Sequence, residues 1–273
     1  HLSYGGRNAF SLILFMYECL AENPDIIVLD DPVSSFDKNK KYAVIDMLFR
    51  GQKSLKNKTV LFMTHDLEPV IDILYNLPHH FDPLPSASFI EAKNGIISEI
   101  PITKSDISTF SQICHENINN RNNEIVKLVY LRRNYETLDN KGMPYQLLSS
   151  LFHKRSSPTR KDNYEDVLLT ESEIAEATTE IQVKLPIFDY ERILVNLNNE
   201  TYMKEAYENA EYNYEKLLIF RIIKDSFPNS KVINKFINET FHIENEFIMQ
   251  INPCKYEVVP SYIIDECNSL VLG

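Results

Sequence analysis

The chain has 273 residues, of which 44% are hydrophobic, and its formal net charge is −11. This hydrophobic content supports a packed core and excludes disordered and collagen-like chains. No run of about 18 apolar residues and no signal peptide occur, so we expect a cytoplasmic protein without a membrane span. The four cysteines are scattered without a Cys-x-x-Cys pair, so we expect free thiols. His1 rather than Met stands first, which is typical of a fragment.

Up to about residue 104, the chain alternates between helical and strand-like segments. Short continuous apolar runs predict buried parallel strands, and longer runs without Gly or Pro predict helices. Asn94-Gly95 lies between two apolar runs and predicts a β-hairpin. The expected helices are Ser11–Ala21, Tyr42–Phe49 and Asp66–Leu74, and the expected strands are Ile26–Leu29, Thr59–Met63, Ser88–Glu91 and Ile96–Ile100. This order predicts an α/β fold, a parallel sheet with flanking helices and a hairpin.

From about residue 105, strand-like runs become scarce and long segments with helical spacing follow. The expected helices are Asn123–Leu138, Tyr145–Lys154, Glu171–Lys184, Tyr202–Asp225 and Val232–Glu246. A polar, proline-containing loop is expected at Ser156–Tyr164. We therefore predict an α/β domain of residues 1–104 followed by a mainly α-helical domain of residues 105–273.

The charge is distributed unevenly along the chain. Residues 121–161 contain 9 basic and 3 acidic side chains, a net charge of +6. Residues 162–273 contain 9 basic and 21 acidic side chains, a net charge of −12. A basic segment in an acidic chain can form an anion-binding or nucleic-acid-binding surface. The alternative is a solvated helical face that pairs with the acidic remainder, and the sequence leaves both interpretations open.

The segment Leu2–Ala9 places a serine and two glycines before a helix. A hydroxyl group and backbone N–H groups can bind an anion at a helix N-terminus. A simple Ser-Gly helix cap has the same composition, so this segment alone does not decide between the two.

Two acids, Asp30 and Asp31, end the first apolar run. Ligands bind at the carboxyl edge of the strands in open α/β sheets. Asp30 can hold Mg²⁺, and Asp31 can orient and polarise an attacking water. The alternative is a strand that is followed by an acidic turn.

His65 follows the second apolar run, and Val33–Asp37 follows the proline after the acid pair. An imidazole at the end of a strand can reach a γ-phosphate or an attacking water. The alternative is a histidine with a structural role only.

The order and spacing of these segments resemble the signature, Walker B, D-loop and switch-histidine elements of ABC ATPases. The amino-acid sequences of these motifs are most similar to those of ABC ATPases allied to SMC and double-strand-break-repair proteins. More narrowly, it resembles the bacterial AAA_13 group, which includes the anticodon-nuclease proteins. The motifs that carry the resemblance are LSYGGRNAFSL, VLDDPVSSFD and LFMTHD, within residues 1–66, and it extends to about residue 104.

This resemblance implies ATP and Mg²⁺ as cofactors and gives several residues a role. Asp30 is the magnesium acid, Asp31 the position of the catalytic base and His65 the switch. The signature residues, which contact nucleotide bound to a second protomer, are Ser3, Gly5 and Gly6, and the D-loop residues at the dimer seam are Ser35 and Asp37. Most ABC proteins have Glu at the position of Asp31, whereas this branch often has Asp.

No phosphate-binding P-loop, G-x-x-x-x-G-K-[ST], occurs in the chain, and the Q-loop is absent too. We therefore expect poor ATP binding and negligible hydrolysis by this chain alone. The resemblance implies that a P-loop-bearing upstream region or partner chain completes the head, and that heads form a homodimer. By family analogy, this ATP-driven switch acts on DNA or RNA in anti-phage defence. The alternative is a non-catalytic assembly subunit that contributes only the signature half of an ATP-binding site.

The basic segment contains Arg132 and Glu136 on one helix face, and His153 follows on another expected helix. Together these residue types can cleave RNA without a metal, because His and Glu exchange protons while Arg stabilises the phosphorane charge. The anticodon nucleases resemble this order, with an ATPase head, then Arg-x-x-x-Glu and a later His. The alternatives are a salt bridge with a surface histidine, or phosphate contacts that hold DNA, RNA or a partner.

Overall fold

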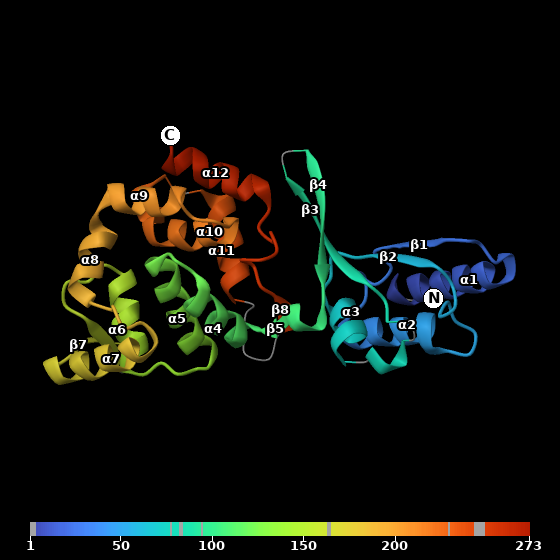
Figure 1. Ribbon diagram of the computed structural model, residues 1–273, viewed down its shortest axis with the longest axis horizontal. Coiled ribbons are helices and arrows are strands. Elements are labelled where there is room, and N and C mark those ends of the chain that lie inside the picture. The colour runs from blue at the N-terminus through green and yellow to red at the C-terminus, as the bar shows by residue number, and fades with distance from the viewer. Residues whose placement is uncertain are drawn as a thin grey trace. The chain divides into compact units, whose positions relative to one another are not determined.

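The computed structural model describes residues 4–76, 78–81, 84–93, 95–162, 165–228, 230–242 and 249–273 (Figure 1). The chain divides into two compact units, His1–Ile107 and Ser108–Gly273. This boundary lies three residues after the one expected at residue 104. Each unit is built around its own hydrophobic core.

The first unit combines helices with two pairs of strands. Its helices are α1 (Tyr4–Glu22), α2 (Lys38–Arg50), α3 (Glu68–Ile71), the π-helical η1 (Asp72–Asn76) and the 3₁₀ turns η2 (Pro78–His80) and η3 (Lys104–Asp106). Its strands are β1 (Ile27–Asp30), β2 (Val60–Met63), β3 (Ala87–Lys93) and β4 (Ile96–Ile102). This mixture of helices and strands agrees with the predicted α/β class.

Strands β1 and β2 pair in parallel, with Ile27 opposite Val60 and Asp30 opposite Met63. The predicted parallel pairing is therefore confirmed. Residues of α1 and α2 share one hydrophobic core with the inner side of this pair, where Ile27 and Leu29 are 2% and 4% exposed. The carboxyl ends of the two strands consequently meet at one edge.

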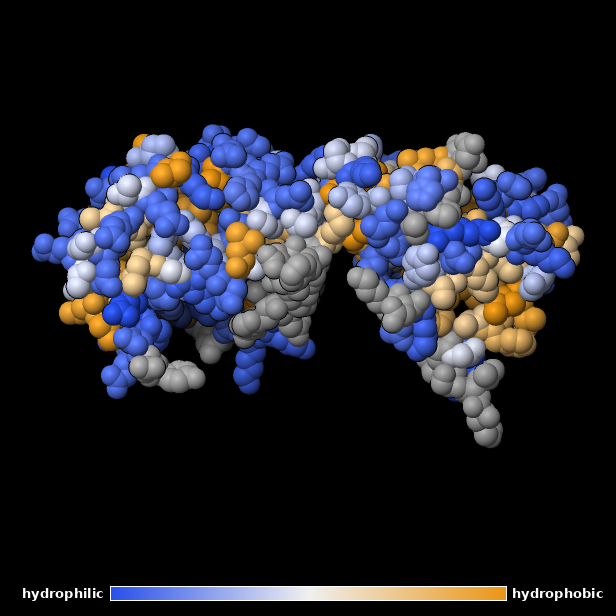
Figure 2. All heavy atoms as spheres, turned by 90° about the horizontal axis from the view of Figure 1, so that it is seen from below, coloured by the Kyte–Doolittle hydropathy of each residue, from blue (hydrophilic) through white to orange (hydrophobic). Residues whose placement is uncertain are grey.

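The other face of the β1–β2 pair is open to solvent. Val28, Leu61 and Met63 are 50%, 53% and 40% exposed. The prediction that both strands are buried is wrong for this face. A parallel strand is buried on both sides only where a second layer of structure covers it, and no described residue covers these side chains closely. Hydrophobic residues also reach the surface of this unit on the face shown at the right of Figure 2.

The predicted β-hairpin is confirmed, and its strands are longer than expected. β3 and β4 pair antiparallel from Ala87 opposite Ile102 to Lys93 opposite Ile96. Gly95 in the turn has a φ of 77°, a left-handed value that glycine adopts without strain.

Helix α1 begins at Tyr4 rather than at Ser11, so Gly5 and Gly6 lie in its first turn instead of before the helix. Glycine disfavours helix by about 1 kcal/mol per residue, which is why a later start was expected. Ala9, in the part of α1 that precedes Ser11, packs against the core and offsets part of this cost.

The predicted helix Asp66–Leu74 is present in two parts. Leu67 is the N-cap residue of α3, and the Asp66 carboxylate just before it accepts a hydrogen bond from the Glu68 N–H at 3.2 Å. α3 is then followed by the wider π-helical turn η1, which ends at Asn76.

The second unit is mainly helical. Its helices are α4 (Phe110–Asn120), α5 (Glu124–Thr137), α6 (Met143–Phe152), α7 (Glu171–Lys184), α8 (Tyr190–Asn198), α9 (Glu200–Glu208), α10 (Asn213–Ile223), the 3₁₀ turn η4 (Lys224–Ser226), α11 (Lys231–His242) and α12 (Ser261–Val271). The short strand β5 (Ile107–Thr109) pairs with β8 (Met249–Ile251), and β6 (Thr159–Asp162) pairs with β7 (Glu165–Leu168).

Helices α5, α6, α7 and α11 confirm four of the predicted helices. Residues 243–246, the end of the predicted helix Val232–Glu246, lie outside the described residues. The predicted helix Tyr202–Asp225 is broken, since α9 ends at Glu208 and α10 starts at Asn213. The break is stabilised by the Glu215 carboxylate, which accepts a hydrogen bond from the Glu211 N–H at 3.0 Å.

The predicted loop Ser156–Tyr164 contains strand β6, and this prediction is wrong. Two hydrogen bonds between Ser150 of α6 and the backbone of Thr159, at 2.9 and 3.0 Å, hold the strand in place. The sequence analysis also missed α4, α8 and α12. These elements are positioned by tertiary contacts that the local pattern does not reveal.

The core of the second unit brings aromatic side chains and thiols together. The rings of Tyr130 and Tyr214 lie 6.3 Å apart, and Tyr130 Oη is 3.2 Å from Cys254 Sγ. The four cysteines are buried free thiols, as predicted. Across the described residues, no helix has the length and apolar character needed to cross a membrane.

Asn252 anchors the segment after β8 to α4. The side-chain amides of Asn252 and Asn117 exchange two hydrogen bonds of 3.1 and 3.2 Å, and both residues are buried. Asn252→Ala leaves the Asn117 amide short of partners, so we expect the free energy of unfolding to fall by about 1–3 kcal/mol. Urea denaturation followed by circular dichroism measures this change. Val195→Ala, at an exposed position of α8, is the control, and an equal loss in both variants contradicts the expectation.

Candidate functional site

The predicted acid pair lies at the carboxyl end of β1. Asp30 is the last residue of the strand, and its side chain is exposed. Asp31 follows with a φ of 49°, a left-handed value that Asp and Asn adopt more readily than most residues. The Asp31 N–H donates to the Met63 carbonyl at 2.8 Å, which ties this turn to the end of β2. The turn thereby directs the Asp31 carboxylate toward the residues after β2.

The Asp31 carboxylate contacts two side chains that follow β2. Its Oδ2 lies 2.9 Å from His65 Nδ1, and its Oδ1 accepts a hydrogen bond from Thr64 Oγ1 at 3.3 Å. The side chains of His65 and Asp31 are 76% and 28% exposed, so the pair is open to solvent. Because each carboxylate oxygen can accept another hydrogen bond, a water bound to Asp31 can lie beside the imidazole.

Helix α2 holds the loop that follows His65. The Lys41 ammonium donates a hydrogen bond to the Asp66 carboxylate and lies 3.1 Å from Glu68 Oε2. The hydrogen bond to Asp66 raises the pKa of Lys41 above its usual value, so the ammonium stays charged. The sequence analysis missed Lys41, because only the fold brings it to the residues after β2.

Helix α1 and the segment Val33–Asp37 are joined by a hydrogen bond that the sequence analysis also missed. Asn8 on α1 donates from Nδ2 to Ser35 Oγ at 2.9 Å. Gly5 and Gly6 lie in the first turn of α1, the end of a helix at which anions bind. Ser3 lies outside the described residues.

Asp37 is the N-cap residue of α2. Its Oδ1 accepts a hydrogen bond from the Lys40 N–H at 3.1 Å, and its other oxygen pairs with the Lys40 ammonium. The side chain is 58% exposed, so it remains accessible from solvent. Its place at a dimer seam stays a prediction.

These residues fit Mg²⁺–ATP in part. Mg²⁺ is usually held by one or two carboxylates together with substrate phosphates and waters, and Asp30 offers an exposed carboxylate beside Asp31. The sequence contains no P-loop lysine and glycines to hold the phosphates. The carboxylates of Asp30 and Asp31 therefore suit Mg²⁺, whereas the sequence supplies no main phosphate cradle.

Three known proteins are similar to part of the chain. The zinc import ATP-binding protein ZnuC of Ehrlichia chaffeensis is 38% identical over 68 residues, 24% of this chain and 26% of that protein. The energy-coupling factor transporter ATP-binding protein EcfA2 of Staphylococcus epidermidis is 35% identical over 51 residues, 19% and 18% of the two chains. The uncharacterized chromosomal cassette SCCmec type IVc protein CR006 of Staphylococcus aureus is 27% identical over 84 residues, which are 28% of this chain and 12% of that protein.

The chain contains an ABC ATPase-like region. The chain matches between 12% and 29% of the length of these relatives. No family model matches the chain, and no solved structure matches it. Two of these relatives are ATP-binding proteins by name.

In the helical unit, Arg132 and Glu136 lie on α5 as predicted. Arg132 Nη1 is 3.6 Å from Glu136 Oε2, so the two form an ion pair. Arg132 Nη2 also donates to Tyr145 Oη at 3.1 Å, and its guanidinium carbon lies 5.0 Å from the centroid of that ring. Tyr145 on α6 therefore fixes the position of Arg132, a contact that the sequence analysis did not predict.

His153 is the C-cap residue of α6 and lies among charged side chains. Burial lowers the pKa of His153, and the positive charges of Arg132, Arg155 and Arg221 lower it further, whereas Asp225 raises it. The net shift is downward, which favours a neutral imidazole that can accept a proton near pH 7. The charge of Arg132 thus reaches His153, Glu136 pairs with Arg132, and Arg221 and Asp225 act on the same imidazole.

Other basic residues of the segment 121–161 pair with acids of the later chain. Arg155 and Lys161 each lie 3.1 Å from a carboxylate oxygen of Asp166, and Arg160 lies 3.4 Å from Glu173. For these three residues the interpretation as a solvated face paired with the acidic remainder is correct.

Proposed function

We propose that this chain is the signature-bearing part of an ABC-type ATPase head that binds and hydrolyses ATP as a dimer. The observation that carries the proposal is the contact between Asp31 and His65 at the ends of two parallel strands. This arrangement places an acid and an imidazole at the strand edge where ligands of α/β sheets bind.

The residues divide the chemistry among them. Mg²⁺–ATP, when bound, supplies the phosphoryl group for transfer, with its charge partly neutralised. Asp30 provides a carboxylate to the metal, and Asp31 orients the attacking water and accepts its proton. Because Nδ1 of His65 faces Asp31, Nδ1 carries the proton and Nε2 is directed to the water or the terminal phosphate.

A P-loop-bearing segment, from an upstream region or from a partner chain, completes the proposed head. The open face of β1 and β2 supports this, since Val28, Leu61 and Met63 lack a covering layer. Two such heads form a homodimer, with the nucleotide between the P-loop of one head and the signature glycines Gly5 and Gly6 of the other. ATP favours the closed dimer because only that state makes both sets of contacts.

We further infer that the head is of the SMC- and repair-like class, within the bacterial AAA_13 group, and that its output acts on DNA or RNA in anti-phage defence. The amino-acid sequences of the three motifs in residues 1–66 support the class of the head. The cationic residues of the helical unit support its action on nucleic acid. Action on nucleic acid also agrees with the expected cytoplasmic location. A non-catalytic assembly role remains the competing proposal.

An ATPase assay with and without the P-loop-bearing segment tests the proposal. We expect phosphate release by the chain alone to match the blank, because the phosphate cradle is missing, and to rise when the completing segment is added. Robust hydrolysis by the chain alone would refute the proposal. ATP-dependent association without hydrolysis would instead identify a non-catalytic assembly subunit.

A second candidate function is metal-free RNA cleavage by Arg132, Glu136 and His153. Two features favour it: Arg132 and Glu136 form an ion pair, and burial together with the charge of Arg132 lowers the pKa of His153. His153 accepts the proton of a 2′-hydroxyl, the 2′-oxygen attacks phosphorus, and the 5′-oxygen leaves with a proton from water, while the Glu136 carboxylate stays paired with Arg132. Arg132 stabilises the added negative charge on the phosphorane. RNA cleavage in the presence of a chelator is the direct test.

A further inference from the structure

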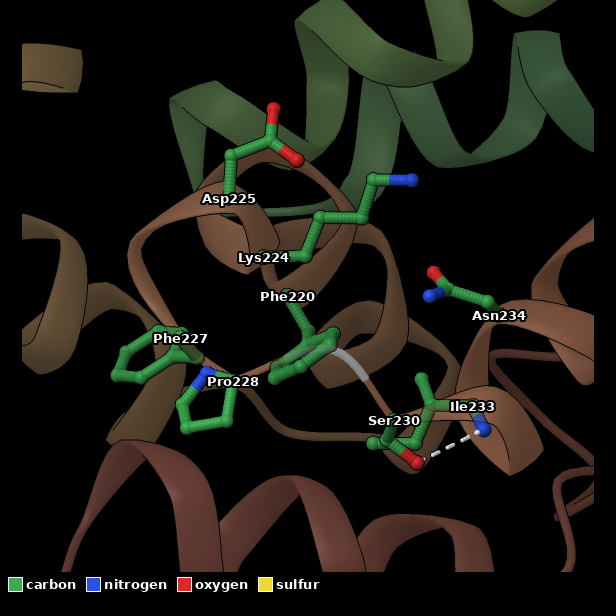
Figure 3. Close-up of a pocket in the computed structure, with 8 residues that line it drawn as sticks. All are labelled: Phe220, Lys224, Asp225, Phe227, Pro228, Ser230, Ile233 and Asn234. Carbon is green, nitrogen blue, oxygen red and sulfur yellow. Dashed lines mark hydrogen bonds between the residues drawn. The ribbon is translucent and has the colours of Figure 1, made fainter.

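A cavity of about 530 Å³ lies in the helical unit, between the end of α10 and the start of α11 (Figure 3). Phe220 and Phe227 contribute its aromatic part, and Lys224 and Asn234 contribute a cation and an amide. Its volume is within the range of about 300–1,000 Å³ that is usual for small-molecule sites. Nothing in the first unit contributes to it.

The cavity has an apolar side and a polar side. The rings of Phe220 and Phe227 are stacked, with centroids 6.1 Å apart and planes 15° apart. Figure 3 shows Phe227 with Pro228 on one side, whereas Asn234 lies on the opposite side, toward which the Lys224 ammonium extends. Phe220 is buried and supports Phe227, so Phe227 presents a positioned aromatic surface at the edge of the cavity.

This cavity adjoins the cluster around His153. Phe227 also lines a second cavity of about 170 Å³, and Lys154, the residue directly after His153, lines that cavity too. Asp225 lines the larger cavity and is the acid whose charge acts on His153. Arg221 lies one helical turn before Lys224 and acts on the same imidazole. The cavity and the proposed cleavage site are therefore neighbours.

Two simpler classes of ligand use only half of this cavity. An apolar molecule makes no use of the Lys224 ammonium or the Asn234 amide. A simple anion makes no use of the aromatic side. A nucleotide uses both, because its base stacks on an aromatic ring, its base edge bonds to an amide and its phosphate pairs with a cation.

We propose that this cavity holds one nucleotide of a single-stranded RNA, with the base against Phe227 and a phosphate toward Lys224 and the Arg132–His153 cluster. The inference rests on the second candidate function, and it names where the substrate strand binds beside the cleavage residues. Single-stranded RNA is the form that offers unstacked bases to such an aromatic surface.

Fluorescence anisotropy with labelled eight-nucleotide oligouridylate and oligoadenylate tests this binding on the full chain. Loss of one base-stacking contact corresponds to about 1–3 kcal/mol, so Phe227→Ala should weaken binding by about fivefold to a hundredfold. Phe227→Tyr keeps the aromatic face and should bind within about twofold of the parent chain. Lys224→Ala should weaken binding and lower the slope of log affinity against log salt by about 1.

Two variants in the same unit serve as matched controls. Lys161→Ala removes a cation on β6 that lines neither cavity, and Tyr262→Ala removes a ring that is 60% exposed on α12. Both should leave RNA affinity unchanged. A thermal melt by circular dichroism establishes that each variant is folded.

The outcomes separate this inference from the cleavage proposal. RNA that is bound through Phe227 but not cleaved supports the binding site and removes the nuclease. RNA that is cleaved by the parent chain and bound equally well by folded Phe227→Ala overturns the binding site alone. Equal affinity for a DNA oligomer of the same sequence and length overturns the assignment to RNA.

Discussion

Replacing Asp31 with asparagine should lower ATP hydrolysis by the completed head at least about 100-fold, because a positioned general base contributes about 10²–10⁴-fold. The amide has the shape of the carboxylate but cannot take the proton of the attacking water. Binding of ATP and closure of the dimer do not require that proton transfer, so ATP-dependent association should persist. Phosphate release under saturating ATP and size-exclusion chromatography with ATP measure the two properties.

The fold around position 31 should tolerate this substitution. Asn adopts left-handed backbone values as readily as Asp, and the backbone N–H of residue 31 keeps its bond to the Met63 carbonyl. Asp72→Asn is the matched control, since Asp72 lies on η1 and contacts Asn76 rather than the strand edge. Hydrolysis by Asp31→Asn at the rate of this control would show that Asp31 is not the base.

The second large effect concerns His153. If His153 is the base for RNA cleavage, His153→Ala should reduce the cleavage rate by about 10²–10⁴-fold. The charges that face His153 are those of Arg132 on α5, Arg155 after α6, Arg221 on α10 and Asp225 on η4, and with burial their net effect lowers its pKa. A base works in its neutral form, so the rate should rise with pH. It should level off at a lower pH than expected for an ordinary histidine, whose pKa is about 6.5.

His115→Ala provides the matched control for this experiment. Burial and the charge of Lys184 lower the pKa of His115 as well, but it contacts Asn134 rather than Arg132 or Glu136. Gel analysis of a labelled RNA over a series of pH values gives both the rate and its pH dependence. Equal loss of cleavage in the two histidine variants, or a rate that falls as pH rises through this range, contradicts the role of His153.

The meeting of Asp31 and His65 could be predicted from the sequence because its signals are local. An apolar run that ends in Asp30 and Asp31, and another that precedes His65, define two strand ends, and parallel pairing brings those ends together. The contacts that support the site could not be predicted in this way. Asn8 meets Ser35, and Lys41 meets Asp66, across 27 and 25 positions of sequence, and nothing in their local pattern indicates the partner.

In the helical unit, local patterns predicted helices where caps and periodicity coincide. α7 begins after the Thr170 capping box and has the expected bounds. The break between α9 and α10 depends on the Glu215 side chain returning to the Glu211 backbone, and β6 depends on hydrogen bonds to Ser150. In the α9–α10 break and in β6, a contact formed on folding therefore determines a structure that differs from the one that local propensity favours.

The open apolar face of β1 and β2 also bears on how such a protein is made. Val28 and Leu61 are half exposed, and exposed apolar patches of this kind are a general liability for aggregation. In the proposed head, binding of the P-loop-bearing segment would bury this face and so protect the polypeptide from degradation. Quality control would then remove orphaned half-heads, so that signature surfaces without a matching nucleotide cradle do not accumulate.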